Sequence, residues 1–139
     1  MSSANLELVR SIYEAWEQDD YSSVEWADPA IEFEMADGPD PGIWTGLDGM
    51  ARGWRTFRST WEHFSPAATE FRELDDEHVL VLVQFAGRAK TSGLDLAQVG
   101  TQQANLIQIR KGKVTRVVLY WDRRRAYADL GLTEESGTP

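Results

Sequence analysis

The chain contains no cysteine and only two histidines, and each shortage excludes a class of chemistry. Without cysteine there is no disulfide framework, no thiolate nucleophile and no cysteine-ligated zinc. His63 and His78 do not stand at metal-ligand spacing, so we expect no metal site, and no cofactor motif is present either. Gly-rich phosphate loops, nucleophile elbows and HExxH motifs are missing too, which argues against nucleotide-binding, serine-hydrolase and zinc-protease functions.

Basic residues and long apolar runs are also scarce. The 139 residues include 14 Lys and Arg against 23 Asp and Glu, a net charge of −9, so neither nucleic acid nor an acidic membrane surface is an expected partner. Val79–Val83 is far shorter than a membrane span, and residues 1–10 carry no apolar signal core. We therefore expect a cytoplasmic protein with a single domain over residues 1–139.

The hydrophobic pattern changes from helical to strand-like near Pro66. Apolar residues spaced by three and four predict a helix from Asn5, its N-cap, to Trp16, and a longer helix with Met50, Trp54, Phe57, Trp61 and Phe64 on one face. The remaining expected elements are a short helix at Tyr21–Trp26, strands at Ile31–Met35, Thr69–Leu74, His78–Lys90, Gln98–Arg110 and Lys113–Asp122, a loop at Asp37–Gly46, and a helix at Arg123–Leu130 between N-cap Asp122 and Gly131.

Helices followed by hairpin-linked strands are typical of an α+β domain whose helices pack on an antiparallel sheet. Two strands, at Val79–Val83 and Val117–Trp121, are apolar on both faces. Helices on one side of the sheet cannot cover both faces. We therefore expect a homodimer in which a second copy covers the other face.

Two segments carry a resemblance to a known family: Pro39–Gly46 entering the long helix, and the chain ending Gly112-Lys113-Val114 through Tyr120-Trp121-Asp122-Arg123 to Ala126. In this order of elements, residues 6–132 resemble the SnoaL-like proteins of the NTF2-like superfamily, also called cystatin-like. The resemblance implies a cone-shaped fold, with a curved antiparallel sheet wrapped around a long helix, an apolar pocket and a dimer across the sheet. That superfamily includes ketosteroid isomerases, polyketide cyclases, epoxide hydrolases, dehydratases and non-catalytic binding domains, so fold alone does not give an activity.

The resemblance implies one candidate catalytic residue. Aligning Trp26–Ala30 with the segment before the isomerases' catalytic aspartate puts Glu34 at the position of that general base. In an apolar pocket the pKa of Glu34 would rise, and the carboxylate could move a proton next to a carbonyl. Alternatively, Glu32 and Glu34 form the solvated side of a strand whose other side is Ile31, Phe33 and Met35.

Other family positions hold residues without catalytic capacity. The isomerases' tyrosine falls at Ile12, beside Tyr13, and the catalytic aspartate of the cyclases and epoxide hydrolases falls at Leu119. Leucine can neither accept a proton nor orient a water, so neither of those two mechanisms transfers. Asp122 is the helix N-cap.

Candidate ligand-binding residues come from the helix stripes and the sheet faces. Trp16 and Trp54 sit at core spacing, with indole N–H groups available to a cavity, and Tyr13 lies on the first helix. Pairing Arg110 with Lys113 across the Lys111-Gly112 turn places Gln102, Ala104, Leu106, Val117, Leu119 and Trp121 on one face. The resemblance puts the Leu119 position in the pocket, so the predicted lining is Tyr13, Trp16, Trp54, Gln102, Leu119 and Trp121. A one-residue bulge would reverse this assignment.

Three hypotheses follow. The first is a protein that binds a small, mostly apolar molecule in the pocket. The second is an isomerase or cyclase that uses Glu34 as general base. The third is a non-catalytic dimeric interaction module whose interior is filled by its own aromatic residues. The presence of a cavity, and whether Glu34 reaches it, distinguishes them.

Overall fold

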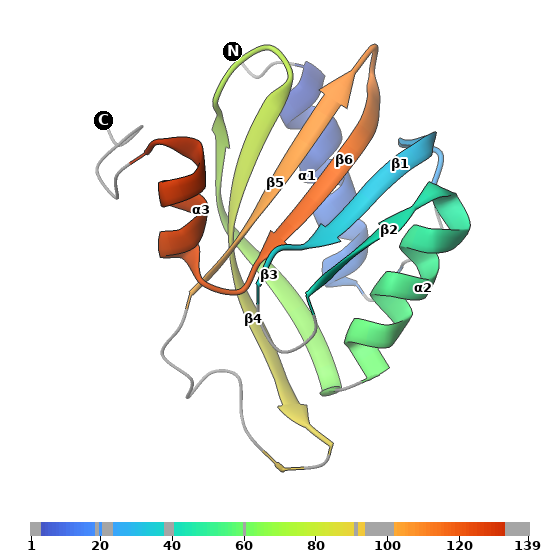
Figure 1. Ribbon diagram of the computed structural model, residues 1–139, viewed down its shortest axis with the longest axis vertical. Coiled ribbons are helices and arrows are strands. Elements are labelled where there is room, and N and C mark those ends of the chain that lie inside the picture. The colour runs from blue at the N-terminus through green and yellow to red at the C-terminus, as the bar shows by residue number, and fades with distance from the viewer. Residues whose placement is uncertain are drawn as a thin grey trace.

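A single six-stranded sheet, with helices on both faces, organises the described chain (Figure 1). The computed structural model describes residues 4–18, 20, 24–37, 41–59, 61–90, 92–93 and 102–132, without the side chains of residues 63 and 65. The elements follow in the order α1 (Ala4–Glu17), β1 (Ala27–Met35), β2 (Gly42–Thr45), α2 (Gly46–Ser59), β3 (Trp61–Glu73), β4 (His78–Ala89), β5 (Gln103–Arg110), β6 (Lys113–Tyr120) and α3 (Arg123–Leu130).

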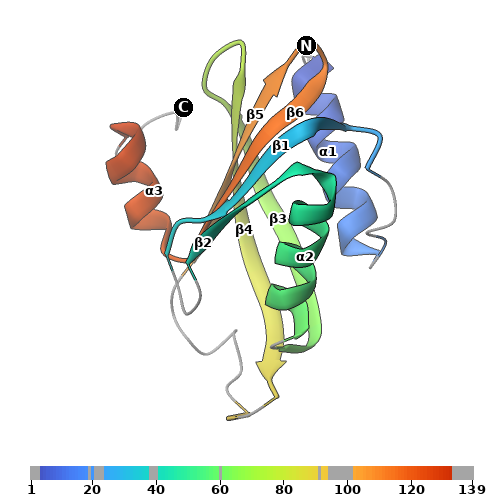
Figure 2. The same ribbon diagram turned by 45° about the vertical axis from the view of Figure 1, so that its right-hand side comes forward.

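The strands lie in the order β2-β1-β6-β5-β4-β3. Four neighbouring pairs are antiparallel, as expected, but β1 runs parallel to β6, so the sheet is mixed. Figure 2 shows α1 and α2 together on one face of the strongly curved sheet and α3 on the other. We call these the inner face and the outer face. The result is the α+β cone expected from the sequence.

The tight turn and the ends of α3 that nearby residues predict are present in the structure. Lys111 and Gly112 have positive φ values of 53° and 75°, as the tight turn between β5 and β6 requires. The carboxylate of Asp122 accepts a hydrogen bond from the Arg124 amide, and Gly131 adopts the left-handed conformation after α3. Both helix-end predictions for α3 are confirmed.

Three boundary predictions were wrong. α2 ends at Ser59, and Trp61 and Phe64 belong to β3, because residues from Trp61 onward pair with β4. Gly42–Thr45, expected as loop, forms β2 because it pairs with β1. α1 begins at Ala4, so Asn5 lies inside the helix and donates to the Asp76 carbonyl instead of capping.

Two further expected segments reach beyond the described residues. Tyr21–Trp26 was expected as a short helix; residues 21–23 lie outside the description, and Glu25 and Trp26 form a turn. Residues 98–101 of the strand expected at Gln98–Arg110 also lie outside it.

A β-bulge changes which residues of β5 share a face with β6. Between the Gln108 and Ile109 positions the register shifts by one residue, so Asn105 lies opposite Leu119 and Ile107 opposite Val117. The predicted face was right for Val117, Leu119 and Trp121 but wrong for Gln102, Ala104 and Leu106. The inner face of β5 carries Gln103, Asn105 and Ile107 in their place, and Ala104 and Leu106 pack on the outer face with α3.

The outer face is covered by the chain's own α3. Ala126 and Tyr127 of α3 pack in one cluster with outer-face residues of β4, β5 and β6: Leu80, Leu82, Ala104, Leu106, Val118 and Tyr120. All of these are at most 7% exposed. The apolar outer positions that suggested a second copy are thus buried without one.

Asp37 ties the end of β1 to the end of β6. Its two carboxylate oxygens accept hydrogen bonds from the Trp121 amide at 2.6 Å and the Asp122 amide at 3.2 Å. The contact fixes the chain where it leaves β6 for α3. No helix in the described residues is long and apolar enough to cross a lipid bilayer.

Candidate functional site

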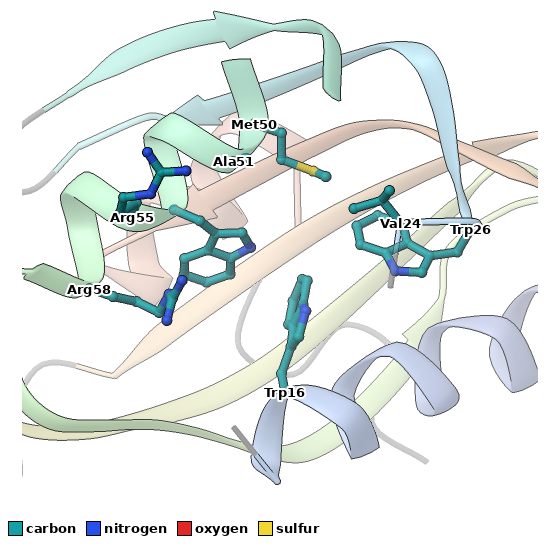
Figure 3. A pocket seen from close by; sticks show the side chains of 8 residues that line it. Trp16, Val24, Trp26, Met50, Ala51, Arg55 and Arg58 are labelled. Carbon is teal, nitrogen blue, oxygen red and sulfur yellow. The ribbon is translucent and has the colours of Figure 1, made fainter. Parts of the chain in front are cut away.

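A cavity of about 170 Å³ lies between α1, α2 and the turn before β1 (Figure 3). Native interiors contain few voids larger than a water molecule, so an opening of this size is unusual in a packed core. Its walls are mainly aromatic and aliphatic, with two arginines: Trp16, Val24, Trp26, Met50, Ala51, Trp54, Arg55 and Arg58.

Two neighbouring stripes of α2 shape one wall. Met50, Trp54 and Phe57 recur at spacings of four and three and are buried against the sheet. Each residue that follows one of them in sequence lies about 100° further around the helix, and Ala51, Arg55 and Arg58 therefore form a second stripe. Met50 and Trp54 line the cavity from the first stripe, and all three residues of the second stripe line it too.

Three tryptophans from different segments of the chain line the cavity and contact one another. Trp16 of α1 meets Trp54 of α2 at a centroid distance of 5.1 Å and an interplanar angle of 81°. It meets Trp26, before β1, at 5.9 Å and 77°. Edge-to-face contact is a favourable aromatic geometry. The indoles therefore support one another as walls.

The arginines provide the charge of the site. Arg55 is exposed and makes no ion pair with the described residues. Arg58 is half-buried, and its Nε atom is shielded from solvent. Among the residues that the structure describes, no Asp or Glu belongs to the lining. The polar side of the cavity is therefore cationic.

A buried hydrogen-bonded pair lies deeper under α1. Asn105 Nδ2 donates to the Tyr13 hydroxyl at 2.5 Å, and both side chains are at most 1% exposed. Burial raises the pKa of the Tyr13 hydroxyl well above its ordinary value, so the phenol stays protonated at neutral pH. Tyr13 packs edge-on against Trp16 at 4.9 Å, which links this pair to the cavity wall.

A second aromatic group lies at the far end of α2. Trp61 and Trp121 stack at 5.8 Å with an interplanar angle of 20°. The ring centroid of Phe57 lies 5.2–6.4 Å from the ring centroids of Phe64, Phe85 and Trp121. None of these residues lines the described cavity.

Glu34 lies on the outer face of β1, away from the cavity. Ile31, Phe33 and Met35 alternate with it and are buried in the inner cluster. The Glu34 carboxylate accepts from Arg116 Nη2 at 2.5 Å, and Arg116 also lies 3.5 Å from Glu32. This is the solvated-strand alternative, and the geometry required of a pocket base is not met.

The other predicted residues are divided between the cavity and its surroundings. Trp16 and Trp54 line it. Leu119 is buried in the inner cluster, and Trp121 stacks on Trp61. Gln102 is exposed, and its side-chain oxygen accepts from Arg123.

Sequence reasoning missed most of the lining. Arg55 and Arg58 are not among the residues predicted to line the pocket, although their stripe directly adjoins the buried one. A helical wheel could have marked Ala51, Arg55 and Arg58 as a border stripe. Val24 and Trp26 carried no signal, because the turn that brings them to α2 has no periodic pattern. Within the described residues, no group of three His, Asp or Glu side chains is placed to hold a metal ion.

No protein-family model and no curated protein matches the chain. Solved structures do match its fold. An NTF2-like protein of unknown function from Burkholderia pseudomallei superposes with a TM-score of 0.72 at 19% identity, covering 91% of this chain and 97% of that one. TerC, co-crystallised with polyporic acid, gives 0.70 at 19% identity over 92% and 98%. A protein with a ketosteroid isomerase-like fold from Catenulispora acidiphila, in complex with trimethylamine, gives 0.66 at 16% identity over 96% and 98%.

Identities this low establish the fold and not the activity. The chain has the NTF2-like, ketosteroid isomerase-like architecture that the sequence resemblance implied.

Proposed function

We propose that the protein binds a small, mostly apolar molecule in the cavity between α1 and α2. The observation that carries this proposal is an opening of about 170 Å³ walled by three indoles. An engineered apolar cavity of about 150 Å³ holds benzene, whereas pockets for drug-sized ligands span about 300–1,000 Å³. The volume suits one ring with a short substituent and not a steroid or a tricyclic polyketide.

Two of the similar structures support small-molecule binding as a use of this fold, since one was solved with polyporic acid and another with trimethylamine. The buried polar groups favour binding over proton transfer. Within the described residues, the buried polar side chains are Gln103 and Asn105, with the phenol of Tyr13 beside Asn105. None of these groups lines the cavity, and amides and a protonated phenol do not accept a proton at neutral pH.

Thermal melting tests the proposal with ligands of two sizes. Acetophenone, a one-ring ketone, is expected to raise the melting temperature by about 4 °C at ten times its Kd, because binding to the folded state stabilises it by mass action. Progesterone, a steroid ketone, is expected to leave it unchanged. Stabilisation by neither compound would favour the interaction-module hypothesis.

Ala51 offers a matched pair of variants for the same test. Ala51→Phe places a ring at the cavity wall and is expected to abolish the acetophenone shift. Ala51→Ser keeps the volume and is expected to retain it. An equal shift in both variants would locate the ligand elsewhere.

The homodimer rests on the fold resemblance alone, now that α3 covers the outer apolar positions. Sedimentation equilibrium at micromolar concentration tests it, and a monomer would contradict it.

A further inference from the structure

The cavity combines an aromatic interior with a charge of unexpected sign. The chain carries a net charge of −9, yet the charged side chains among the described lining residues are both arginines. Arg55 and Arg58 stand three residues apart on one side of α2, and Figure 3 shows them on the same side of the cavity. Trp26 and Val24 lie opposite. One end of the site is therefore apolar and the other is cationic.

This charge argues against one obvious occupant. A box of tryptophan rings is a favourable environment for an organic cation, because the ring faces are electron-rich. A cation here would instead lie near two guanidinium groups, and among the described lining residues there is no carboxylate to offset the repulsion. An anion would instead be attracted, since Arg55 has no carboxylate partner among the described residues and can donate hydrogen bonds to a ligand.

We infer that the molecule bound in this cavity is a small aromatic carboxylate, with its ring among the indoles and its carboxylate at Arg55 and Arg58. The inference rests on the proposed function, because it names the class of ligand for the same cavity. Guanidinium groups present paired N–H donors that match the two oxygens of a carboxylate. Partial burial of Arg58 strengthens such a contact, since fewer water molecules compete for it. About 170 Å³ leaves room for one ring and a short acidic arm.

The test compares three ligands of nearly equal size and different charge: phenylacetate, phenylacetamide and 2-phenylethylamine. Dissociation constants are measured at pH 7 by isothermal titration calorimetry, with tryptophan fluorescence as a report from the cavity walls. Phenylacetate is expected to bind roughly 10- to 100-fold more tightly than phenylacetamide, the range that one charge-assisted hydrogen bond supplies. The amine is expected to bind most weakly.

Variants on α2 assign the preference to the cavity. Arg55→Gln combined with Arg58→Gln is expected to remove the preference for phenylacetate and leave phenylacetamide affinity within about twofold. Arg52→Gln removes a positive charge from an exposed position on the same helix that does not line the cavity, so it is expected to keep the preference. Melting curves without ligand check that each variant folds.

Failures of the two proposals are distinguishable. Equal binding of acid and amide, or a preference for the amine, would overturn the carboxylate assignment and leave cavity binding intact. Loss of the preference in Arg52→Gln to the same extent as in the double variant would also overturn it, because the effect would then be the helix's general charge. Absence of binding by all three ligands at millimolar concentration would contradict both proposals.

Discussion

The two ends of the aromatic interior differ in how their tryptophans meet. At the cavity end, Trp16 holds Trp26 and Trp54 at 77° and 81°. At the other end, Trp61 and Trp121 stack at 20°, with Phe57 packed beside Trp121. The tryptophans at one end line the cavity, and those at the other end do not. The role of an aromatic residue therefore depends on its place in the fold, which composition does not reveal.

The largest loss of stability is expected at the end of the interior where Trp61 and Trp121 stack. Phe85 is 1% exposed and contacts both Phe57 and Phe64. Phe85→Ala is expected to lower the free energy of unfolding by about 3–5 kcal/mol, because it leaves a cavity in a closely packed cluster. Trp26→Phe, at the cavity end, is expected to cost less than about 1.5 kcal/mol but to weaken ligand binding. Urea unfolding measures the loss of stability, and calorimetry measures ligand affinity. A larger loss of stability in Trp26→Phe than in Phe85→Ala would contradict this comparison.

The next largest loss of stability is expected where α2 packs closely on the sheet, a contact that sets the position of the cavity wall. A Cβ added at Gly53 would lie 2.9 Å from Phe33 Cδ2 and 3.0 Å from Trp44 Cδ2. Gly53→Ala is therefore expected to cost about 1–3 kcal/mol by overpacking.

Gly49, one turn earlier on α2, is the matched control. A Cβ there would meet its nearest atom at 3.4 Å, an ordinary contact. Gly49→Ala is therefore expected to be neutral or stabilising by up to about 1 kcal/mol, through helix propensity. Equal costs at the two glycines, measured by urea unfolding, would contradict this close approach of α2 to the sheet.

Each side of the sheet has a buried tyrosine whose ionisation at alkaline pH affects stability, Tyr13 on the inner side and Tyr120 on the outer side. Burial raises the pKa of Tyr120 on the outer face to about 12, with Asp129 adding to the shift, and raises that of Tyr13 further. Both groups hold their protons more tightly when folded than when unfolded. Their contribution to stability is therefore complete below about pH 10 and is lost as pH rises toward 12.

Urea unfolding at pH 8 to 11 measures this loss. Tyr120→Phe is expected to make the decline of stability above pH 10 shallower, and Tyr13→Phe to do the same. An unchanged slope in both variants would mean that neither hydroxyl keeps its proton through burial.

The smallest effect is expected at Glu34. Its pairing with Arg116 is partly exposed, so Glu34→Gln should change stability by less than about 0.5 kcal/mol and leave ligand affinity intact. Should a ketone enolisation activity be found, it is expected to survive the substitution. Loss of such turnover with normal melting would restore the general-base hypothesis.

Sequence reasoning succeeded where the signal is local. α1, α3 with its two ends, and the Lys111-Gly112 turn depend on residues within a few positions of one another. It failed where pairing between distant segments decides. β2 forms because it pairs with β1, Trp61 leaves its helical pattern to pair with Ala89, and the bulge beside Gln108 places Asn105 opposite Leu119.

The candidate site was predicted only in part for the same reason. Trp16 and Trp54 lie on periodic helices and could be selected from the sequence. Arg55 lies on a stripe that a helical wheel marks, but the packing of α2 decides whether that stripe faces a cavity. Trp26 reaches the cavity through the turn before β1, which has no periodic pattern. The orientation of Glu34, in contrast, follows from a local pattern. Alternation along β1 predicts that its side chain points away from the inner face, and the structure agrees.

A crystal structure with bromobenzene tests the central claim most directly, because the anomalous signal of bromine marks the ligand without interpretation of its shape. The account predicts one bromine site among Trp16, Trp26 and Trp54, absent from crystals of Ala51→Phe. Bromine beside Trp61 and Trp121 instead, or no ordered bromine in the wild-type protein, would contradict it.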